Sequence, residues 1–429
     1  IDDLEVNGGL VVSTGENIFG DLTADGGDIS LGMGDNLMAD ADLNAIDGTI
    51  SLTGVTASNG GNMTAETNGE ILIHDSNLNN VLNDGLMTFD QNSGISLDEL
   101  TSNGTLNIGS TDIGDITRVD VSTNATLSGT TTINTGATLD VTKNVKFINN
   151  QVTVNGTLTA GNDIALEHAQ VSGTGGTISA KGEIGIDSDS SLTMGGNSTV
   201  KAGTDMTIAG NADIEGSLSV GNDLNVSGSL TSDGTTKVGG NLAVTDGDVT
   251  LNGTANVSDK TTVSGNGSLT LDSTGAGDLG NVTVNDDGSL TVTGNGNSVN
   301  ADNITMNGNA SGSISDTVLN LNGGQGEITL NDASSLDIAN TTVNGSISTT
   351  NTSSTDSTHL GLDKVDINGD LTVVGGDLVL SNDNTVSGSL NISDTVNVTV
   401  NDENGNPGTL VVKEGTLIDP NASLTIDEK

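Results

Sequence analysis

The phrase AGNDIAL, which begins at Ala160, recurs down the chain with small variations at a nearly constant interval. The variants are AKGEIGI from Ala180, AGTDMTI from Ala202, VGNDLNV from Val220 and VGGNLAV from Val238. The first alternating apolar residues of the five phrases, at intervals of about 20 residues, are Ile164, Ile184, Met206, Leu224 and Leu242. A fixed period in this range is typical of a solenoid, whose units bury their apolar faces by stacking on one another.

The same interval returns near both ends of the chain. It separates Ile29, Ile50 and Ile71 near the beginning, and Leu371, Leu390 and Leu410 near the end. Elsewhere the apolar residues form alternating triplets, such as Leu218-Ser219-Val220 and Leu290-Thr291-Val292, bounded by Gly and Asn. This alternation predicts short, half-buried strands. A helical apolar period is not sustained anywhere, so we expect no long helix.

One period has room for three strands of four or five residues with tight turns, which is one triangular coil of a parallel β-helix. We therefore predict an all-β protein, a right-handed parallel β-helix (β-solenoid) of about 20 residues per coil that runs continuously through residues 1–429. Gly and Asn suit its corners because both tolerate positive φ, and stacked Asn side chains are expected to form ladders. Residues 346–360, almost without apolar side chains, are expected to form a loop or hinge.

The composition limits the core and the partners. The chain has 429 residues, with no Trp, Tyr or Cys, three Phe and 61 Gly, so small aliphatic side chains must fill a thin core. Its 57 acidic and 10 basic residues give a net charge of −47, which excludes nucleic acid as a partner and disfavours an anionic membrane. No stretch approaches the length of a transmembrane helix, so we expect no direct membrane insertion by this segment.

The pattern [AV]-G-x-D-[ILM]-x-[ILV], seen at residues 160–166, 202–208 and 220–226, resembles the repeats of filamentous haemagglutinin-type exoproteins. More broadly, the chain is similar to the passenger regions of bacterial autotransporter adhesins. This tight pattern covers a small part of the chain, and a looser pattern of triplets and glycines covers most of it. The resemblance implies a segment of a larger exported protein, displayed extracellularly on the outer membrane of a bacterium. Its implied partners are host or bacterial cell-surface molecules, matrix, or the protein itself.

Enzymes that act on polysaccharides also use parallel β-helices, so catalysis needs its own evidence. Arg118 is the only arginine, aromatic platforms for sugars are lacking, and no pair among the many carboxylates is singled out. The stretch QNSGI from Gln91 lacks the acidic residue that a serine-protease signature has before its serine, here Ser93. We therefore predict no enzyme activity, and neither catalytic nor cofactor-binding residues.

Histidine and acidic residues are the candidate metal ligands of this chain. His74, His168 and His359 lie far apart in sequence and are expected at exposed or corner positions rather than at a zinc site. In the pairs His74-Asp75 and Glu167-His168, strand alternation predicts side chains on opposite faces.

Calcium is a closer alternative. GGQGEITLN from Gly323 approximates a calcium-binding nonapeptide, but Glu327 falls one position before the usual Asp, so a glycine-rich corner leading into a strand is favoured. The acidic clusters at stacked corners are candidates for weakly bound calcium: Asp25/Asp28, Asp246/Asp248 and Asp286/Asp287. No cofactor is otherwise expected, and the identity of any metal ligand stays unknown. Threonine runs such as 130–132 are expected to lie out of register, unlike the arrays of ice-binding solenoids.

The sequence thus favours the passenger or stalk of a surface adhesin that acts in adhesion, self-association or biofilm formation through many weak contacts. A structural subunit of a surface layer or filament is the alternative, and a β-helical polysaccharide-active enzyme is the second alternative. Because the chain carries a charge of −47, self-association is expected to depend on salt or divalent cations.

Overall fold

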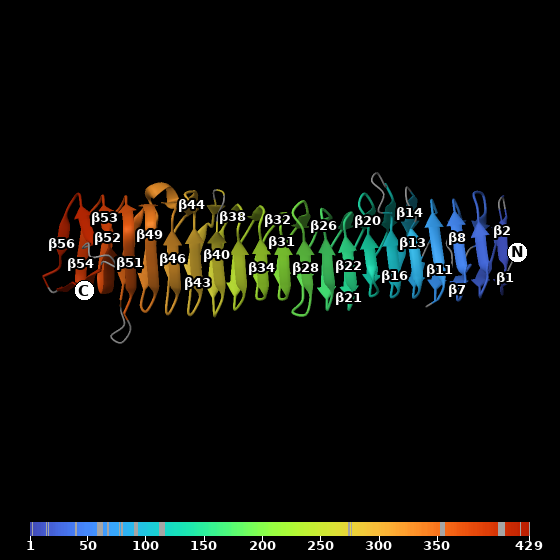
Figure 1. Cartoon of the computed structure of the whole chain (residues 1–429), viewed down its shortest axis with the longest axis horizontal. Coiled ribbons are helices and arrows are strands. Elements are labelled where there is room, and N and C mark those ends of the chain that lie inside the picture. The colour runs from blue at the N-terminus through green and yellow to red at the C-terminus, as the bar shows by residue number, and fades with distance from the viewer. Residues whose placement is uncertain are drawn as a thin grey trace. The chain divides into compact units, whose positions relative to one another are not determined.

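The computed structural model describes residues 1–429 except 2, 14, 16, 39–40, 58–62, 67, 77, 79, 90–92, 111–115, 273–274, 276, 352–356, 402–407, 421 and 429. Contacts divide the chain into two units, residues 1–217 and residues 218–429. In each unit short parallel strands lie side by side, coil after coil, about 20 residues apart (Figure 1). The predicted parallel β-solenoid is therefore confirmed as the fold.

Three stacks of parallel strands form the first unit. The first stack contains β1 (Asp3–Val6), β4 (Asp21–Ala24), β7 (Leu43–Ala45), β10 (Met63–Ala65), β12 (Asn80–Asn83), β15 (Glu99–Ser102), β18 (Ala125–Leu127), β21 (Val145–Ile148), β24 (Ile164–Glu167), β27 (Ile184–Ile186) and β30 (Met206–Ile208). The second contains β2 (Leu10–Ser13), β5 (Asp28–Leu31), β8 (Thr49–Thr53), β11 (Glu70–His74), β13 (Leu86–Phe89), β16 (Thr105–Ile108), β19 (Thr131–Ile133), β22 (Gln151–Val154), β25 (Gln170–Gly173), β28 (Ser191–Met194) and β31 (Asn211–Ile214). The third contains β14 (Gly94–Leu97), β17 (Arg118–Val121), β20 (Thr138–Val141), β23 (Thr157–Ala160), β26 (Thr177–Ala180) and β29 (Thr199–Ala202), and β3 (Ile18–Phe19), β6 (Asn36–Leu37) and β9 (Thr56–Ala57) form a small separate sheet.

The second unit repeats this arrangement. One stack contains β33 (Leu224–Val226), β36 (Leu242–Thr245), β39 (Lys260–Ser264), β42 (Asn281–Val284), β45 (Ile304–Met306), β48 (Glu327–Asn331), β50 (Ser346–Thr350), β52 (Leu371–Ser381), β54 (Leu390–Asn401) and β56 (Thr416–Ile418). Another contains β34 (Ser229–Ser232), β37 (Asp248–Leu251), β40 (Ser268–Asp272), β43 (Ser289–Thr293), β46 (Ser311–Ser315), β49 (Ser335–Asn344), β51 (His359–Ile367) and β57 (Ser423–Glu428). The last contains β35 (Thr236–Val238), β38 (Ala255–Val257), β41 (Gly277–Asp278), β44 (Ser298–Ala301), β47 (Val318–Leu321), β53 (Asp383–Val386) and β55 (Thr409–Val412), while β32 (Ser217–Val220) spans the boundary. The long strands β49, β51, β52 and β54 bend from one stack into another.

Alternation of small aliphatic and polar residues produces these strands. In β23, Leu158 and Ala160 are buried while Thr157 and Thr159 face outward. The apolar residues pair with their equivalents in the next coil, so Leu158 lies beside Ile178 and Ala160 beside Ala180. Each inward layer is therefore covered by the layers above and below, and a core of aliphatic side chains, with Phe19, Phe89 and Phe147 as its only rings among the described residues, excludes water.

The loop expected over residues 346–360 is shorter than predicted at both ends. Ser346–Thr350 form β50, which pairs with Glu327–Asn331 of β48, and His359 begins β51. Residues 352–356 of that prediction lie outside the described residues. Pairing extends into this polar sequence because buried Ile347 continues the inward column between Ile328 and Leu371. One inward aliphatic residue is therefore enough to form a strand here, because the strands on both sides supply backbone hydrogen-bond partners.

Candidate functional site

Polar side chains repeat in register on the outward faces. In the first unit Thr138, Thr157, Thr177 and Thr199 occupy equivalent positions in successive coils. In the second unit one outward column contains Thr262, Thr283, Thr305, Thr329, Ser348 and Thr372. The expectation that the threonines lie out of register was therefore wrong. Coil lengths vary at the corners, so equal spacing in sequence is lost while alignment in space is kept.

Asparagine ladders join successive coils in the second unit, as the sequence predicted. The Asn307 amide donates to Asn285 Oδ1 over 2.9 Å, and the Asn331 amide donates to Asn307 Oδ1 over 2.9 Å. A second ladder runs along Asn300, Asn320, Asn344 and Asn368, with amide-to-oxygen distances of 3.0, 2.6 and 2.8 Å. Each interior amide donates to one neighbour and accepts from the other, which fixes the orientation of its side chain.

Many carboxylates stabilise the stacking of coils. One member of each predicted acidic cluster accepts a hydrogen bond from the following coil: Asp28 from the Thr49 N–H (3.0 Å), Asp246 from the Asn266 N–H (2.9 Å) and Asp287 from the Asn309 amide (3.1 Å). Among the residues that the structure describes, no group of three or more His, Asp or Glu side chains is placed to hold a metal ion. Weak calcium binding stays a prediction.

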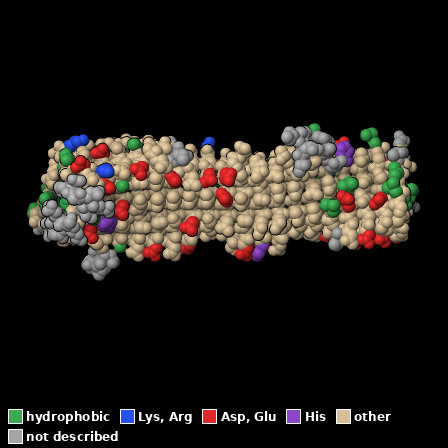
Figure 2. Space-filling view, in the orientation of Figure 1, with side chains coloured by type: hydrophobic (Ala, Val, Ile, Leu, Met, Phe, Trp, Pro, Cys, Tyr) green, Lys and Arg blue, Asp and Glu red, His purple; other side chains and the backbone are tan. Residues whose placement is uncertain are grey.

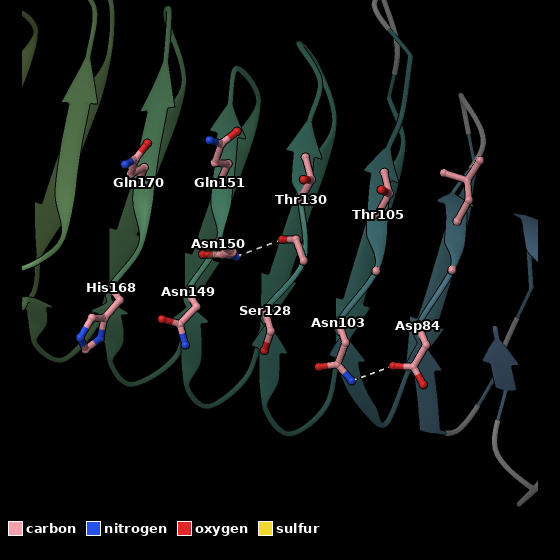
Figure 3. Close-up of a pocket in the computed structure, with 14 residues that line it drawn as sticks. Asp84, Asn103, Thr105, Ser128, Thr130, Asn149, Asn150, Gln151, His168 and Gln170 are labelled. Carbon is pink, nitrogen blue, oxygen red and sulfur yellow. Dashed lines mark hydrogen bonds between the residues drawn. The ribbon is translucent and has the colours of Figure 1, made fainter. Parts of the chain in front are cut away.

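A groove of about 600 Å³ runs across several coils of the first unit at one corner. Figure 3 shows most of its labelled side chains in two rows, coil after coil, with Asn150 between the rows. One row contains Asp84, Asn103, Ser128, Asn149 and His168, and the other contains Thr105, Thr130, Gln151 and Gln170. Only the ends of the first row carry titratable groups. The lining is otherwise uncharged and hydrogen-bonding, in a chain whose net charge is −47.

Glycines form the floor of the groove between the two rows. A Cβ added to Gly104 would lie 2.1 Å from the Gly85 carbonyl oxygen, and one added to Gly129 would lie 1.8 Å from the Gly104 oxygen. Both distances are far below van der Waals contact, so a side chain cannot replace glycine there without a shift of the backbone. Tight stacking of the corner thus requires glycine, and the groove is a consequence of the missing side chains.

Asn150 takes the glycine position in the coil that follows Gly129. Its amide nitrogen donates to the carbonyl oxygens of Leu127 (2.8 Å) and Gly129 (3.3 Å), and the side chain is buried (Figure 3). Asn150 Oδ1 has no hydrogen-bond partner among the described residues. The amide therefore closes the floor where the glycine series ends.

The three predicted histidine positions are at or near strand ends, and each histidine lies within 3.5 Å of at least one carboxylate. His74 Nε2 lies 3.4 Å from Asp75 Oδ2, and Asp75 has a φ of 45°, so this pair does not point to opposite faces as predicted. His168 also has a positive φ, of 54°, which turns it out of the strand at the corner. In each pair the left-handed residue ends the extended run, so strand alternation does not apply to it.

His168 contacts two carboxylates. Its Nε2 lies 3.1 Å from Asp189 Oδ2, its Nδ1 lies 3.5 Å from Asp187 Oδ2, and its backbone N–H donates to Asp187 over 3.0 Å. Burial raises the pKa of Asp187, but hydrogen bonds from the Ser190 hydroxyl and from the N–H groups of His168 and Asp189 outweigh it, so the pKa is lowered. These contacts hold a corner together.

The other singled-out residues lie in turns, or at or next to the first residue of a strand. Arg118 Nε lies 2.7 Å from Asp120 Oδ1, and its guanidinium also binds Asp140 in the next coil. Gly323 and Gly324 form a tight turn, and Glu327 begins β48, which confirms the glycine-rich corner that leads into a strand. Ser93 is buried.

Sequence reasoning missed the groove and the aligned columns. A signal for the groove was present in the tripeptides Asp84-Gly85-Leu86, Asn103-Gly104-Thr105 and Ser128-Gly129-Thr130, each a polar residue followed by glycine at the start of a strand. On the face drawn in Figure 2, acidic side chains lie singly or in small groups among uncharged ones. No helix among the described residues is both long and apolar enough to cross a membrane.

Comparisons with protein-family models, with curated proteins and with solved structures found no match to this chain. The fold and the surfaces therefore define its class by themselves: a parallel β-solenoid whose outward faces carry repeated hydroxyl and amide side chains.

Proposed function

We propose that the chain is the extracellular passenger or stalk of a bacterial surface adhesin, and that it acts through many weak contacts rather than by catalysis. The observation that supports this function is the coil-by-coil repetition of outward Thr, Ser and Asn side chains in register. Each exposed hydrogen bond contributes little by itself, but a repeated array adds many at a fixed spacing of about 4.8 Å.

The ladders and corner carboxylates make this surface suitable for adhesion. Because Asn307 and Asn320 are hydrogen-bonded to both neighbouring coils, their side chains lose little further freedom when a partner binds. Between its ends at Asp84 and His168, the groove offers an uncharged place for hydroxyl-rich or amide-rich groups of a cell surface or matrix.

The test is adhesion of beads coated with the full chain. We expect beads to bind epithelial cells, matrix or other bacteria more than beads coated with an equally acidic control protein, and to release gradually under shear. Binding no higher than the control on all these surfaces would contradict an adhesive function. Turnover of a polysaccharide by the same preparation would favour the enzyme alternative.

A further inference from the structure

Two adjacent outward columns of the second unit are free of titratable groups over consecutive coils. The central column contains Asn225, Ala243, Thr262, Thr283, Thr305, Thr329, Ser348, Thr372 and Asn391, which lie in register. The column beside it contains Thr245, Ser264, Asn285, Asn307, Asn331, Thr350, Val374 and Ser393. We call these two columns the neutral strip.

The neutral strip is unusual for this molecule. The chain has 57 acidic residues, and the other outward faces of the second unit carry several of them. The face of β34–β51 includes Asp248 and Asp337 and continues into the second half of β52 with Asp377, and the third face includes Asp278 and Asp366. On the face of β34–β51 an uncharged column runs from Thr231 to Ser313 but ends at Asp337 after five coils. The neutral strip stands out because two adjacent columns stay uncharged over eight or nine coils.

Charge lies at both borders of the neutral strip. On one side a third column of the same face carries Asp223, Lys260, Glu327 and Asp370. On the other side the corner that ends the strands carries aspartates with positive φ, namely Asp246, Asp286, Asp332 and Asp394. A partner that lies along the strip meets uncharged groups at its centre and carboxylates at its edges, so its binding should strengthen when salt screens those edges.

We propose that the neutral strip is the surface through which two copies of this chain associate, face to face. This inference rests on the proposed adhesive function and names a partner and a surface for it. A second copy carries the same charge of −47, so faces that carry carboxylates repel one another, and like charges across an interface cost several kcal/mol. The strip is the part of the second unit where this repulsion is smallest.

The repeat of the strip also matches a second copy. Strands in both copies are about 4.8 Å apart, so a hydroxyl or amide of one strip meets an equivalent group of the other at every coil. The ladder Asn285–Asn307–Asn331 is already ordered by its own hydrogen bonds, and Thr and Ser side chains are short, so little side-chain entropy is lost on contact. Identical side chains that stack along the assembly axis, with Asn ladders among them, pack in this way between the paired sheets of cross-β assemblies.

The size of the strip predicts a weak association. Nine coils at about 4.8 Å and two outward columns give a strip roughly 40 Å long and roughly 12 Å wide. Two such strips bury on the order of 900 Å² in total, which is the range of transient contacts. A symmetric pair uses the same strip on both copies and closes as a dimer, and in the antiparallel arrangement the central residue, Thr305, faces Thr305 of the second copy.

Sedimentation velocity on the full chain tests the proposal with a matched pair of variants. The face variant is Thr305→Asp with Thr329→Asp, two neighbouring positions of the strip. The control is Thr270→Asp with Thr291→Asp, two neighbouring outward positions on the face of β40 and β43. At about 1 M ionic strength, where the Debye length is about 3 Å, we expect weak dimers of the unmodified chain. The face variant should raise the dissociation constant about tenfold or more, and the control should change it less than about threefold.

A cysteine reporter keeps the test informative if the charged variant misfolds, since the chain has no cysteine of its own. With a short bis-maleimide, Thr305→Cys should give cross-linked dimers and Thr291→Cys should not. Equal cross-linking at both positions, equal weakening by both Asp pairs, or a purely monomeric chain at high salt would overturn the proposal. Bead adhesion to foreign surfaces decides the proposed function separately. Loss of that adhesion in the face variant with unchanged self-association would overturn the proposal too, because it would assign the strip to a foreign partner.

Discussion

The asparagine ladder offers the sharpest test of how coils are held together. In the variant Asn307→Ala two hydrogen bonds are lost, the one donated to Asn285 Oδ1 (2.9 Å) and the one accepted from the Asn331 amide (2.9 Å). A partly buried hydrogen bond between neutral groups contributes about 1 kcal/mol net, so the expected loss is about 2 kcal/mol. Solenoids open locally, so this loss should appear in the opening of β45 and β48 rather than in one global transition.

Native-state amide hydrogen exchange measures that opening. A loss of about 2 kcal/mol corresponds to roughly thirty-fold faster exchange in β45 and β48, with little change in distant coils. The control is Asn309→Ala, which removes one exposed hydrogen bond to Asp287 (3.1 Å) and should change the opening free energy by less than about 0.5 kcal/mol. If Asn307→Ala exchanges like the unmodified chain, or like Asn309→Ala, the ladder does not stabilise the stacking.

Three further predictions concern other features. In thermal unfolding, Gly104→Ala should destabilise the first unit by more than about 1 kcal/mol, because the added Cβ would lie 2.1 Å from the Gly85 oxygen. The control Gly185→Ala, with no atom within 4 Å of the added Cβ, should be neutral or slightly stabilising. Equal effects of the two variants would refute the steric argument. The hydrogen bond between His359 and Asp337 raises the pKa of His359 and lowers the pKa of Asp337, so the pair stabilises the fold between about pH 4 and about pH 6.5 and its contribution is lost as the pH rises through the raised pKa of His359. The variant His359→Gln should therefore melt at a lower temperature than the unmodified chain at about pH 5.5, where its free energy of unfolding is smaller by less than about 1 kcal/mol. At about pH 8.5 the two melting temperatures should be nearly equal. An equal difference at both pH values would contradict this assignment. Clumping of beads coated with the chain should increase with ionic strength or with divalent cations, because screening reduces the repulsion between like charges. Clumping that does not change with salt or with a chelator would show that charge repulsion does not limit self-association.

The repeating core was predictable because it depends on local chemistry. Alternating triplets such as Leu290-Thr291-Val292 predict strands by themselves, and the regular return of the apolar phrase predicts coils. The corner predicted at the glycine-rich stretch before Glu327 was confirmed for the same reason, since the conformation of a tight turn is set by its own neighbouring residues. Such features need no knowledge of which residues meet across the fold.

Register across coils was not predictable by counting. The column through Thr283, Thr305, Thr329 and Ser348 advances by a different interval at each step, because the corners absorb insertions of different length. A count at fixed spacing misses this alignment, and it missed the neutral strip for the same reason. The corner residue Asp75 likewise defeated strand alternation, since a single positive φ reverses the direction of a side chain.

The sequence by itself determined that this protein is an acidic, aromatic-poor parallel β-solenoid, because periodicity, composition and charge are properties of the chain alone. Only the tertiary structure decided which polar residues share a face, where the glycine corners leave a groove, and which surface is without charge. Those properties depend on pairing between residues of successive coils, and backbone hydrogen bonds between coils, rather than sequence spacing, fix that pairing.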